Sequence, residues 1–481
     1  MATYLINNKT SYSVNNWILL QFFFLLSALV LNSIFLNSLY LCFIIYSISS
    51  ISILRLFRFL PRIGNDFLDP GFLVVFFNIL TIIPMTASML IGIEVLRIEW
   101  AISQIEIFIK VVYLHLVFIP AFAITYYLIN RKSNPTTSFN FSLLTNKVWI
   151  YLFFTIALIV LIINISSGNF YSRADGSSGV MVQKLFQDHS FLSRQIFSRL
   201  SNLESYAMNI AFGVILCRAK TIERARIYMF VLPILYFTYS FVFQGSRAAA
   251  TILIPMIAFA DIVRWKGKLL NWPLFLFVFL GGFLFMHFVE VLETFFLGGG
   301  FGNWQVALFT ALEPRMVENV GAITVMVDDL NVPLRYGSSY LDAFKALIPN
   351  QLVAEPVVPL SEWFMQILYG KSIVELGNAW AFSSIAEGYL NFKVYGVVLS
   401  GFITALLASL IRYFKCSRKL SSIGPVLFTS SILISYKLLR NEFVDIIKKF
   451  EWTIILVFVL IFLAIVILAA SKKDFNLKGA S

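Results

Sequence analysis

Twelve apolar segments, most of them long enough to cross a lipid bilayer, constrain this sequence more than any other feature. A helix rises about 1.5 Å per residue, so about 20 apolar residues span a hydrocarbon core roughly 30 Å thick. The segments are 17–36, 38–57, 72–93, 107–130, 148–165, 203–217, 227–244, 247–263, 273–292, 394–411, 422–438 and 452–470. We therefore predict an all-α polytopic integral membrane protein with about 12 transmembrane helices.

Composition and charge agree with this prediction. The chain is 59% hydrophobic and only 13% charged, whereas soluble domains are about 25% charged. Its net charge of +12 would suggest nucleic acid in a soluble protein. In a membrane protein, Lys and Arg collect in cytoplasmic loops instead. Most of the basic residues fall in one set of alternate loops, which predicts that both termini are cytoplasmic and that nucleic acid is not a partner.

Two long loops are then expected on the outer side, at 166–202 and 293–393. They divide the chain into nine membrane helices in 1–292, the large loop 293–393, and three helices with a cytoplasmic tail in 394–481. Within the large loop, Trp304–Val327 has helical periodicity but carries Glu313, Pro314 and Arg315 near its centre. These residues favour an interfacial or re-entrant helix over the alternative of a true span that lines a cavity.

Several kinds of site are not indicated by the sequence. Cys42, Cys217 and Cys416 show neither disulfide nor zinc spacing. No nucleotide-binding loop, zinc-protease motif or nucleophile elbow occurs, so we expect no metal and no cofactor. The acidic pair Asp328-Asp329 fits a solvated helix end.

Four short segments carry an Arg beside residues that bend the backbone, an arrangement that suits an anionic ligand such as pyrophosphate. For each, an Arg at the headgroup level, a plain turn or a solvated basic loop stays open as the alternative. The segments are Gln244-Gly245-Ser246-Arg247, Glu313-Pro314-Arg315, Arg335-Tyr336-Gly337-Ser338-Ser339-Tyr340 followed by Ile348-Pro349, and Arg440-Asn441-Glu442-Phe443, in which Glu442 could orient Arg440.

Two places offer a proton acceptor. His287, Glu290 and Glu293 share one helical face within about 120° of arc, where packing against the large loop is the alternative to a role in a site. Glu387, just before the tenth apolar segment, is the better general-base candidate because more motif residues surround it.

The stretch from Ser383 to Val398, with Glu387, Tyr389, Asn391-Phe392 and Gly396, resembles the segment that ends the large periplasmic loop in O-antigen (Wzy-type) oligosaccharide repeat unit polymerases. The segments containing Arg247, Arg335 and Arg440 match in the same order, and chain length and helix number agree over nearly the whole chain. The family's usual Gly after Asn-Phe is Lys393 here.

This resemblance implies a glycosyltransferase of polysaccharide or lipopolysaccharide biosynthesis in the bacterial inner membrane. The donor would be a growing glycan on undecaprenyl pyrophosphate, and the acceptor a hydroxyl of a new lipid-linked repeat unit. We assign the pyrophosphate to Arg247, Arg315, Arg335 and Arg440, general-base catalysis to Glu387 or His287, and contacts to the glycan or the loop to Tyr336, Tyr340, Tyr389 and Asn391.

Expected partners are the lipid-linked oligosaccharide, membrane lipid, a chain-length-regulating co-polymerase and the flippase of the same pathway. Two other functions stay open. A flippase for lipid-linked oligosaccharides is expected to have short loops and related halves, and neither is visible here. An O-antigen ligase is expected to have a functional His in the long outer loop, and no His lies between Glu293 and Lys393.

Overall fold

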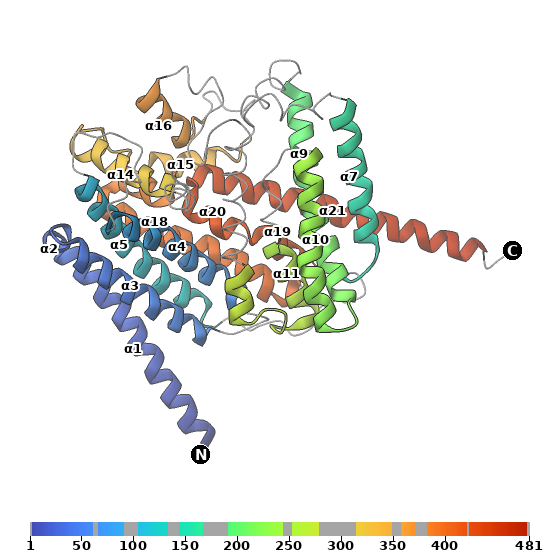
Figure 1. Ribbon diagram of the computed structural model, residues 1–481, viewed down its shortest axis with the longest axis horizontal. Coiled ribbons are helices and arrows are strands. Elements are labelled where there is room, and N and C mark those ends of the chain that lie inside the picture. Colours follow the sequence, from blue (N-terminus) through green and yellow to red (C-terminus); the bar gives the residue numbers. More distant parts are fainter. Residues whose placement is uncertain are drawn as a thin grey trace.

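The computed structural model describes residues 2–60, 66–90, 104–132, 144–166, 191–243, 253–278, 314–348, 357–370, 382–420 and 423–478. The regular secondary structure in these ranges consists of helices, with no strand (Figure 1). The N-terminal half contains α1 (Ala2–Val30), α2 (Asn32–Leu36), α3 (Leu39–Leu56), η1 (Phe57–Phe59), η2 (Asp66–Leu68), α4 (Pro70–Leu90), α5 (Gln104–Asn130), α7 (Val148–Ser166), α9 (Phe191–Arg218), α10 (Ile222–Phe243), α11 (Leu253–Ala260) and η5 (Asp261–Trp265). The C-terminal half contains α14 (Pro314–Asp328), α15 (Ser338–Lys345), α16 (Leu360–Tyr369), α18 (Ser384–Cys416), η7 (Arg418–Leu420), α19 (Gly424–Ser431), α20 (Ile434–Arg440) and α21 (Phe443–Lys478).

The helices confirm that this is an all-α protein with membrane-spanning segments. Among the described residues, four helices are long and apolar enough to cross a bilayer: Leu39–Leu56, Ile105–Asn130, Ser384–Cys416 and Phe443–Ala469. Each of the twelve predicted segments overlaps a helix, although only 273–278 of the ninth is described. The eleventh, 422–438, is broken into α19 and α20 by a turn at Ile432 and Leu433.

Helix α5 forms the centre of the molecule. It packs against α1 and α3, and also against α18, α14 and α4. Nearly all of its residues are buried, and Phe118, Phe122 and Tyr126 stack in sequence along one face. Helices α7, α9, α10 and α11 pack against one another beside this core (Figure 1). The described part of the predicted helix 304–327 is helical and belongs to α14, and residues 319–327 are buried against α5 and α18.

A buried ion pair ties the start of α4 to the last turns of α18. Arg412 pairs with Asp69, and both side chains are less than one tenth exposed. Tyr126 of α5 donates its hydroxyl to Asp69 Oδ1 at 2.7 Å, and the backbone N–H of Gly71 donates to the same oxygen at 3.0 Å. A buried charge is stable only when it is paired and hydrogen-bonded, and this arrangement meets both conditions.

Helix α18 is a hairpin of two helical legs, 384–391 and 394–416. The chain reverses at Phe392 (φ −142°, ψ 29°) and Lys393 (φ 51°, ψ −137°), neither of which is helical. Because the legs are antiparallel, the Ser400 hydroxyl reaches the carbonyl of Ser384 at 2.6 Å, although sixteen residues separate them in sequence. A continuous helix would hold these two residues about 24 Å apart.

Two glycines allow the legs to cross at van der Waals contact. A Cβ on Gly396 would lie 1.9 Å from the carbonyl oxygen of Gly388, and a Cβ on Gly388 would lie 2.6 Å from that of Gly396. No other residue type fits at either position without moving the backbone. The reversal brings Glu387 and Asn391, on the short leg, next to the first residue of α21 and the segment 335–340.

Candidate functional site

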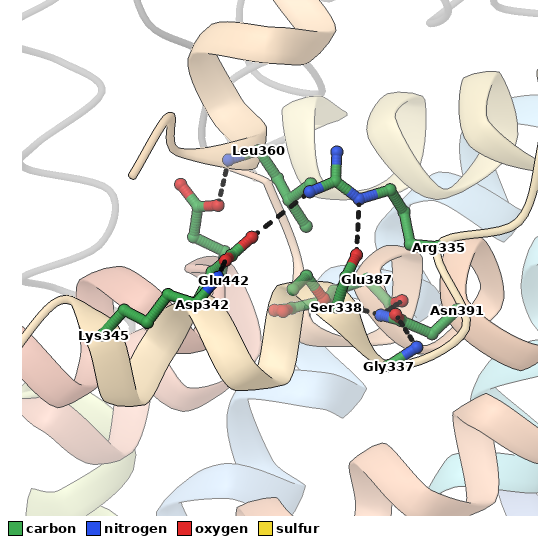
Figure 2. Close-up of polar contacts among 10 residues, drawn as sticks. Arg335, Gly337, Ser338, Asp342, Lys345, Leu360, Glu387, Asn391 and Glu442 are labelled. Atoms are coloured by element: carbon green, nitrogen blue, oxygen red, sulfur yellow. Dashed lines mark hydrogen bonds and ion pairs between the residues drawn. The ribbon is translucent and has the colours of Figure 1, made fainter. Parts of the chain in front are cut away.

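Asn391 is the residue that fixes the segment ahead of α15 to the hairpin. Its Oδ1 accepts a hydrogen bond from the backbone N–H of Gly337 at 2.8 Å. Its Nδ2 donates to Ser339 Oγ at 2.7 Å and to the carbonyl of Glu387 at 2.8 Å (Figure 2). The side chain is fully buried, with both ends of its amide in use. Asn391 therefore positions its neighbours, and in this structure it has no exposed surface for a glycan.

Arg335 lies beside this junction, in the extended segment before α15. Its backbone N–H donates to the carbonyl of Leu390 at 3.1 Å. The guanidinium donates through Nε to Ser338 Oγ at 3.0 Å and through Nη2 to Asp342 Oδ2 at 3.3 Å, where Lys345 also pairs with Asp342. Nη1 contacts none of these groups and points away from them (Figure 2). The side chain as a whole is 29% exposed, so Arg335 is not sealed inside the protein.

Glu387 lies beneath this segment and is fully buried. Its Oε2 accepts a hydrogen bond from the backbone N–H of Phe443, the first residue of α21, at 2.8 Å. The partial positive charge at the N-terminus of a helix offsets part of the cost of burying this carboxyl group. The other oxygen, Oε1, is buried without a hydrogen bond of ordinary geometry to any described residue, although the Ser339 hydroxyl lies beside the carboxyl group. Oε1 is thus the oxygen of Glu387 that makes no well-formed hydrogen bond to a described residue.

Tyr340 covers Glu387 from the side of α15. Its ring packs against Phe443 with centroids 5.4 Å apart. Its hydroxyl is buried near Glu387 and Asn391, and within the described ranges no group is placed to complete a good hydrogen bond with it. Burial, followed by the nearby Glu387 carboxylate, raises the pKa of Tyr340 well above its usual range. The neutral phenol is therefore the stable form at physiological pH.

A second buried carboxyl, Glu442, joins α21 to α16. It accepts hydrogen bonds from the backbone N–H of Leu360, from that of Ser361 at 3.3 Å, and from the Ser361 hydroxyl at 2.8 Å. Burial raises the pKa of Glu442 to about 7 and outweighs the hydrogen bonds from Ser361, which lower it. Glu442, expected to orient Arg440, instead turns its carboxyl group to the N-terminus of α16.

Asp328, which the sequence suggested was a solvated helix end, is a point of contact between three helices. It accepts the hydroxyl of Tyr389 at 2.6 Å and pairs with Lys110 of α5 at 3.5 Å and Lys393 at 3.3 Å. These contacts fasten the end of α14 to α5 and to the turn of the α18 hairpin. In this structure the Tyr389 hydroxyl donates its hydrogen bond to Asp328, not to a ligand.

The structure brings together Arg335, Tyr340, Glu387 and Asn391 of the predicted site residues. Tyr336 flanks them on a turn with φ 45° and is 73% exposed, so its ring is accessible to a ligand. Arg440 is three residues from Phe443, but its guanidinium lies 5.8 Å from the ring of Tyr436 and donates to the Tyr436 hydroxyl at 3.2 Å.

The remaining predicted residues cannot be placed in the cluster. Arg247, His287, Glu290, Glu293 and Glu313 lie outside the described residues. Arg315 begins the first turn of α14, and its side chain also lies outside the described part. Where side chains are described, no group of three His, Cys, Asp or Glu residues could hold a metal ion.

Sequence reasoning did not assign roles to Ser339, Asp342 or the amide of Gly337. Asp342 could have been found, because Arg335 and Asp342 lie on either side of a predicted turn and carry opposite charges. The pairing of Glu442 with α16 had no such signal, since more than eighty residues separate Leu360 from Glu442.

The class of protein defined by the described residues is a helical membrane protein with a buried polar cluster formed by the segment 335–340, a helical hairpin and the start of α21. No protein-family model, curated protein or solved structure matches this chain.

Proposed function

We propose that this protein is a polymerase that transfers a growing glycan from undecaprenyl pyrophosphate onto a new lipid-linked oligosaccharide repeat unit. The proposal rests on the contact between three segments that lie far apart in the sequence: 335–340, 383–398 and 440–443. Asn391 binds Gly337 and Ser339, and Glu387 binds the backbone of Phe443. These segments are three of those on which the resemblance to O-antigen polymerases rests.

Arg335 is the pyrophosphate ligand that the geometry supports best. When the bond between the anomeric carbon and the pyrophosphate breaks, its electron pair moves to the pyrophosphate oxygen, and the leaving group gains negative charge. A guanidinium that is already held by Ser338 and Asp342 can stabilise this charge through Nη1 without reorganising. Arg247, Arg315 and Arg440 are further candidates for the same ligand, and Tyr336 for the sugar.

Glu387 is the base that accepts the proton of the acceptor hydroxyl as that oxygen bonds to the anomeric carbon. Its Oε1, which makes no well-formed hydrogen bond to a described residue, supports this role. His287 is the second candidate. Because Glu387 is fully buried beneath the side chains of Ser339 and Tyr340, an acceptor reaches it only after these two side chains change rotamer. The reaction as written requires no cofactor.

The proposed setting is the bacterial inner membrane, crossed about twelve times, with both termini in the cytoplasm. The positions of the basic residues support this orientation. The loop 293–393 would then be periplasmic, where flipped lipid-linked units arrive. A chain-length-regulating co-polymerase and the flippase would act beside it.

The test is complementation of cells that lack this gene, read as the ladder of surface glycan on gels. Wild-type protein should restore the ladder. Arg335→Met and Glu387→Gln should reach the membrane at normal levels, unfold at near-normal temperature, and leave single repeat units on the lipid A core. The matched control is Lys345→Met, which removes the other cation on Asp342 and should restore the ladder.

Two outcomes would overturn the proposal. If the deletion removes even the single capped repeat unit, a flippase or a ligase explains the protein better. If Arg335→Met restores a full ladder, the pyrophosphate role assigned to Arg335 is wrong.

A further inference from the structure

Helix α15 packs Tyr340 and its small side chains against the protein and exposes its other large apolar side chains. The outward residues are Leu341 (64% exposed), Phe344 (66%), Leu347 (42%) and Ile348 (46%), the last two in the turn that follows the helix. The face against the protein consists of Ser339, Ala343 and Ala346, all less than one tenth exposed. An outward apolar face of this kind is unfavourable in water and indicates a surface that is covered in the working protein.

The neighbours of α15 define its position along the molecule. It packs against α21, with Tyr340 against Phe443, the first residue of that helix (Figure 1). The first two turns of α21 are polar on one side, where they carry Asp445, Lys448 and Lys449. Charged residues at the start of a spanning helix are typical of the headgroup level.

Beyond these turns, α21 changes character. From Trp452 to Ala470 it is almost entirely apolar, and one broad face is exposed: Ile455, Phe458, Val459, Phe462, Ile465 and Val466 are each between 41% and 65% exposed. This face is the one that acyl chains would cover. Helix α15 therefore lies next to the polar turns that precede the lipid-contacting part of α21.

We propose that the outward face of α15 lies in the boundary between lipid headgroups and acyl chains, with phospholipid as its occupant. Leu341, Phe344 and Ile348 enter the acyl region, and Lys345, whose side chain is 59% exposed and pairs with Asp342, lies at the level of the lipid headgroups. This inference does not depend on the glycosyltransferase activity.

Size argues for lipid over a protein partner. A stable protein interface buries about 800 Å² on each side and involves about 20 to 30 residues. An eight-residue helix with four apolar side chains falls well short of that. Four such side chains are enough to hold a helix at the surface of a bilayer to which its chain is already anchored by spanning helices.

The experiment places an environment-sensitive fluorophore on the full-length protein in phospholipid nanodiscs. Cys42, Cys217 and Cys416 are buried, so a thiol-reactive NBD probe should label an introduced surface cysteine selectively. The test variant is Phe344→Cys. The controls are Phe462→Cys, on the exposed apolar face of α21, and Arg224→Cys, on the exposed polar start of α10. The NBD fluorescence of each labelled variant is then measured with three quenchers. Two are lipids that carry a nitroxide near the headgroup or deep in the acyl chain, and the third is aqueous iodide.

We expect the probe at 344 to be quenched several-fold more by the shallow nitroxide than by iodide, and more by the shallow than by the deep nitroxide. The probe at 462 should respond to the deep nitroxide and the probe at 224 only to iodide. The proposal is overturned if the probe at 344 behaves like that at 224. It is also overturned if position 344 is protected from both lipid nitroxides and from iodide, because a second copy or another protein would then cover α15.

Discussion

At the scale of single residues, Glu442 gives the clearest pH dependence. Its folded pKa of about 7 lies above its ordinary value of 4.5, so the folded state holds the proton more tightly than the unfolded state. This contribution to stability is complete below about pH 4.5 and is lost as pH rises to about 7. Glu442→Gln removes the titration. The melting temperature of the variant minus that of wild type should therefore increase between pH 4.5 and 7 and change little above pH 7.

Thermal unfolding in detergent across this pH range measures the difference. The matched control is Glu223→Gln, a fully exposed carboxyl at the start of α10, which should leave the pH profile nearly unchanged. If the difference in melting temperature between Glu442→Gln and wild type stays constant with pH, Glu442 does not titrate between pH 4.5 and 7.

Lys393 has φ 51° and ψ −137°, a conformation that favours glycine. Replacing it with Gly or with Ala removes the exposed ion pair to Asp328 in both cases, and such pairs contribute about 0 to 1 kcal/mol. Only the Ala variant retains the backbone strain. We expect Lys393→Gly to be more stable than Lys393→Ala by about 1 kcal/mol in unfolding experiments. Equal stability of the two variants would mean that the turn is not strained.

At the scale of elements, the crossing of the α18 legs should be intolerant of any side chain. Gly396→Ala places a methyl group within 1.9 Å of the Gly388 carbonyl, so the legs must separate. Overpacking of this kind costs about 1 to 3 kcal/mol. We expect a lower melting temperature and loss of function, because the shift moves Glu387 and Asn391. Leu399→Ala, on the exposed face of the long leg, is the control that should change little.

The positions of the helices could be predicted from the sequence, but the hairpin could not. Apolar run lengths placed Leu39–Leu56 and Gln104–Asn130 within three residues of their observed ends. The boundary predicted between residues 393 and 394 coincides with the break at Phe392 and Lys393, but no sequence feature indicated that residues 384–391 form a helix that folds back along the next one. Periodicity reports which residues are apolar, not which distant backbone they meet.

The candidate site could be predicted only in part. The sequence motifs assigned Arg335, Glu387 and Asn391 to one site, and these residues do lie close together. The motifs did not predict the direction in which each side chain points. Tyr389 was expected to contact a ligand and instead binds Asp328. Hydrogen-bond partners are decided by packing between segments far apart in sequence, and a single sequence holds little information about that packing.

At the scale of the whole molecule, the pair of Asp69 and Arg412 links the N-terminal and C-terminal halves across 343 positions. Arg412→Met leaves Asp69 buried without its cation and should cost about 3 to 5 kcal/mol. Adding Asp69→Asn removes the stranded charge. The double variant should therefore be more stable than the sum of the two single losses predicts, and a double-mutant cycle in detergent measures this coupling. Additive losses would show that the two groups do not interact.

The contact between Gly388 and Gly396 also limits how this region can change during evolution. Each residue inserted into or deleted from a helix rotates everything beyond it by about 100°. One insertion between these glycines would turn a side chain into the crossing and move Asn391 away from Gly337. In relatives that keep the hairpin, we expect the loop ahead of residue 384 to vary freely in length, while the eight-residue interval between the two glycines does not change at all.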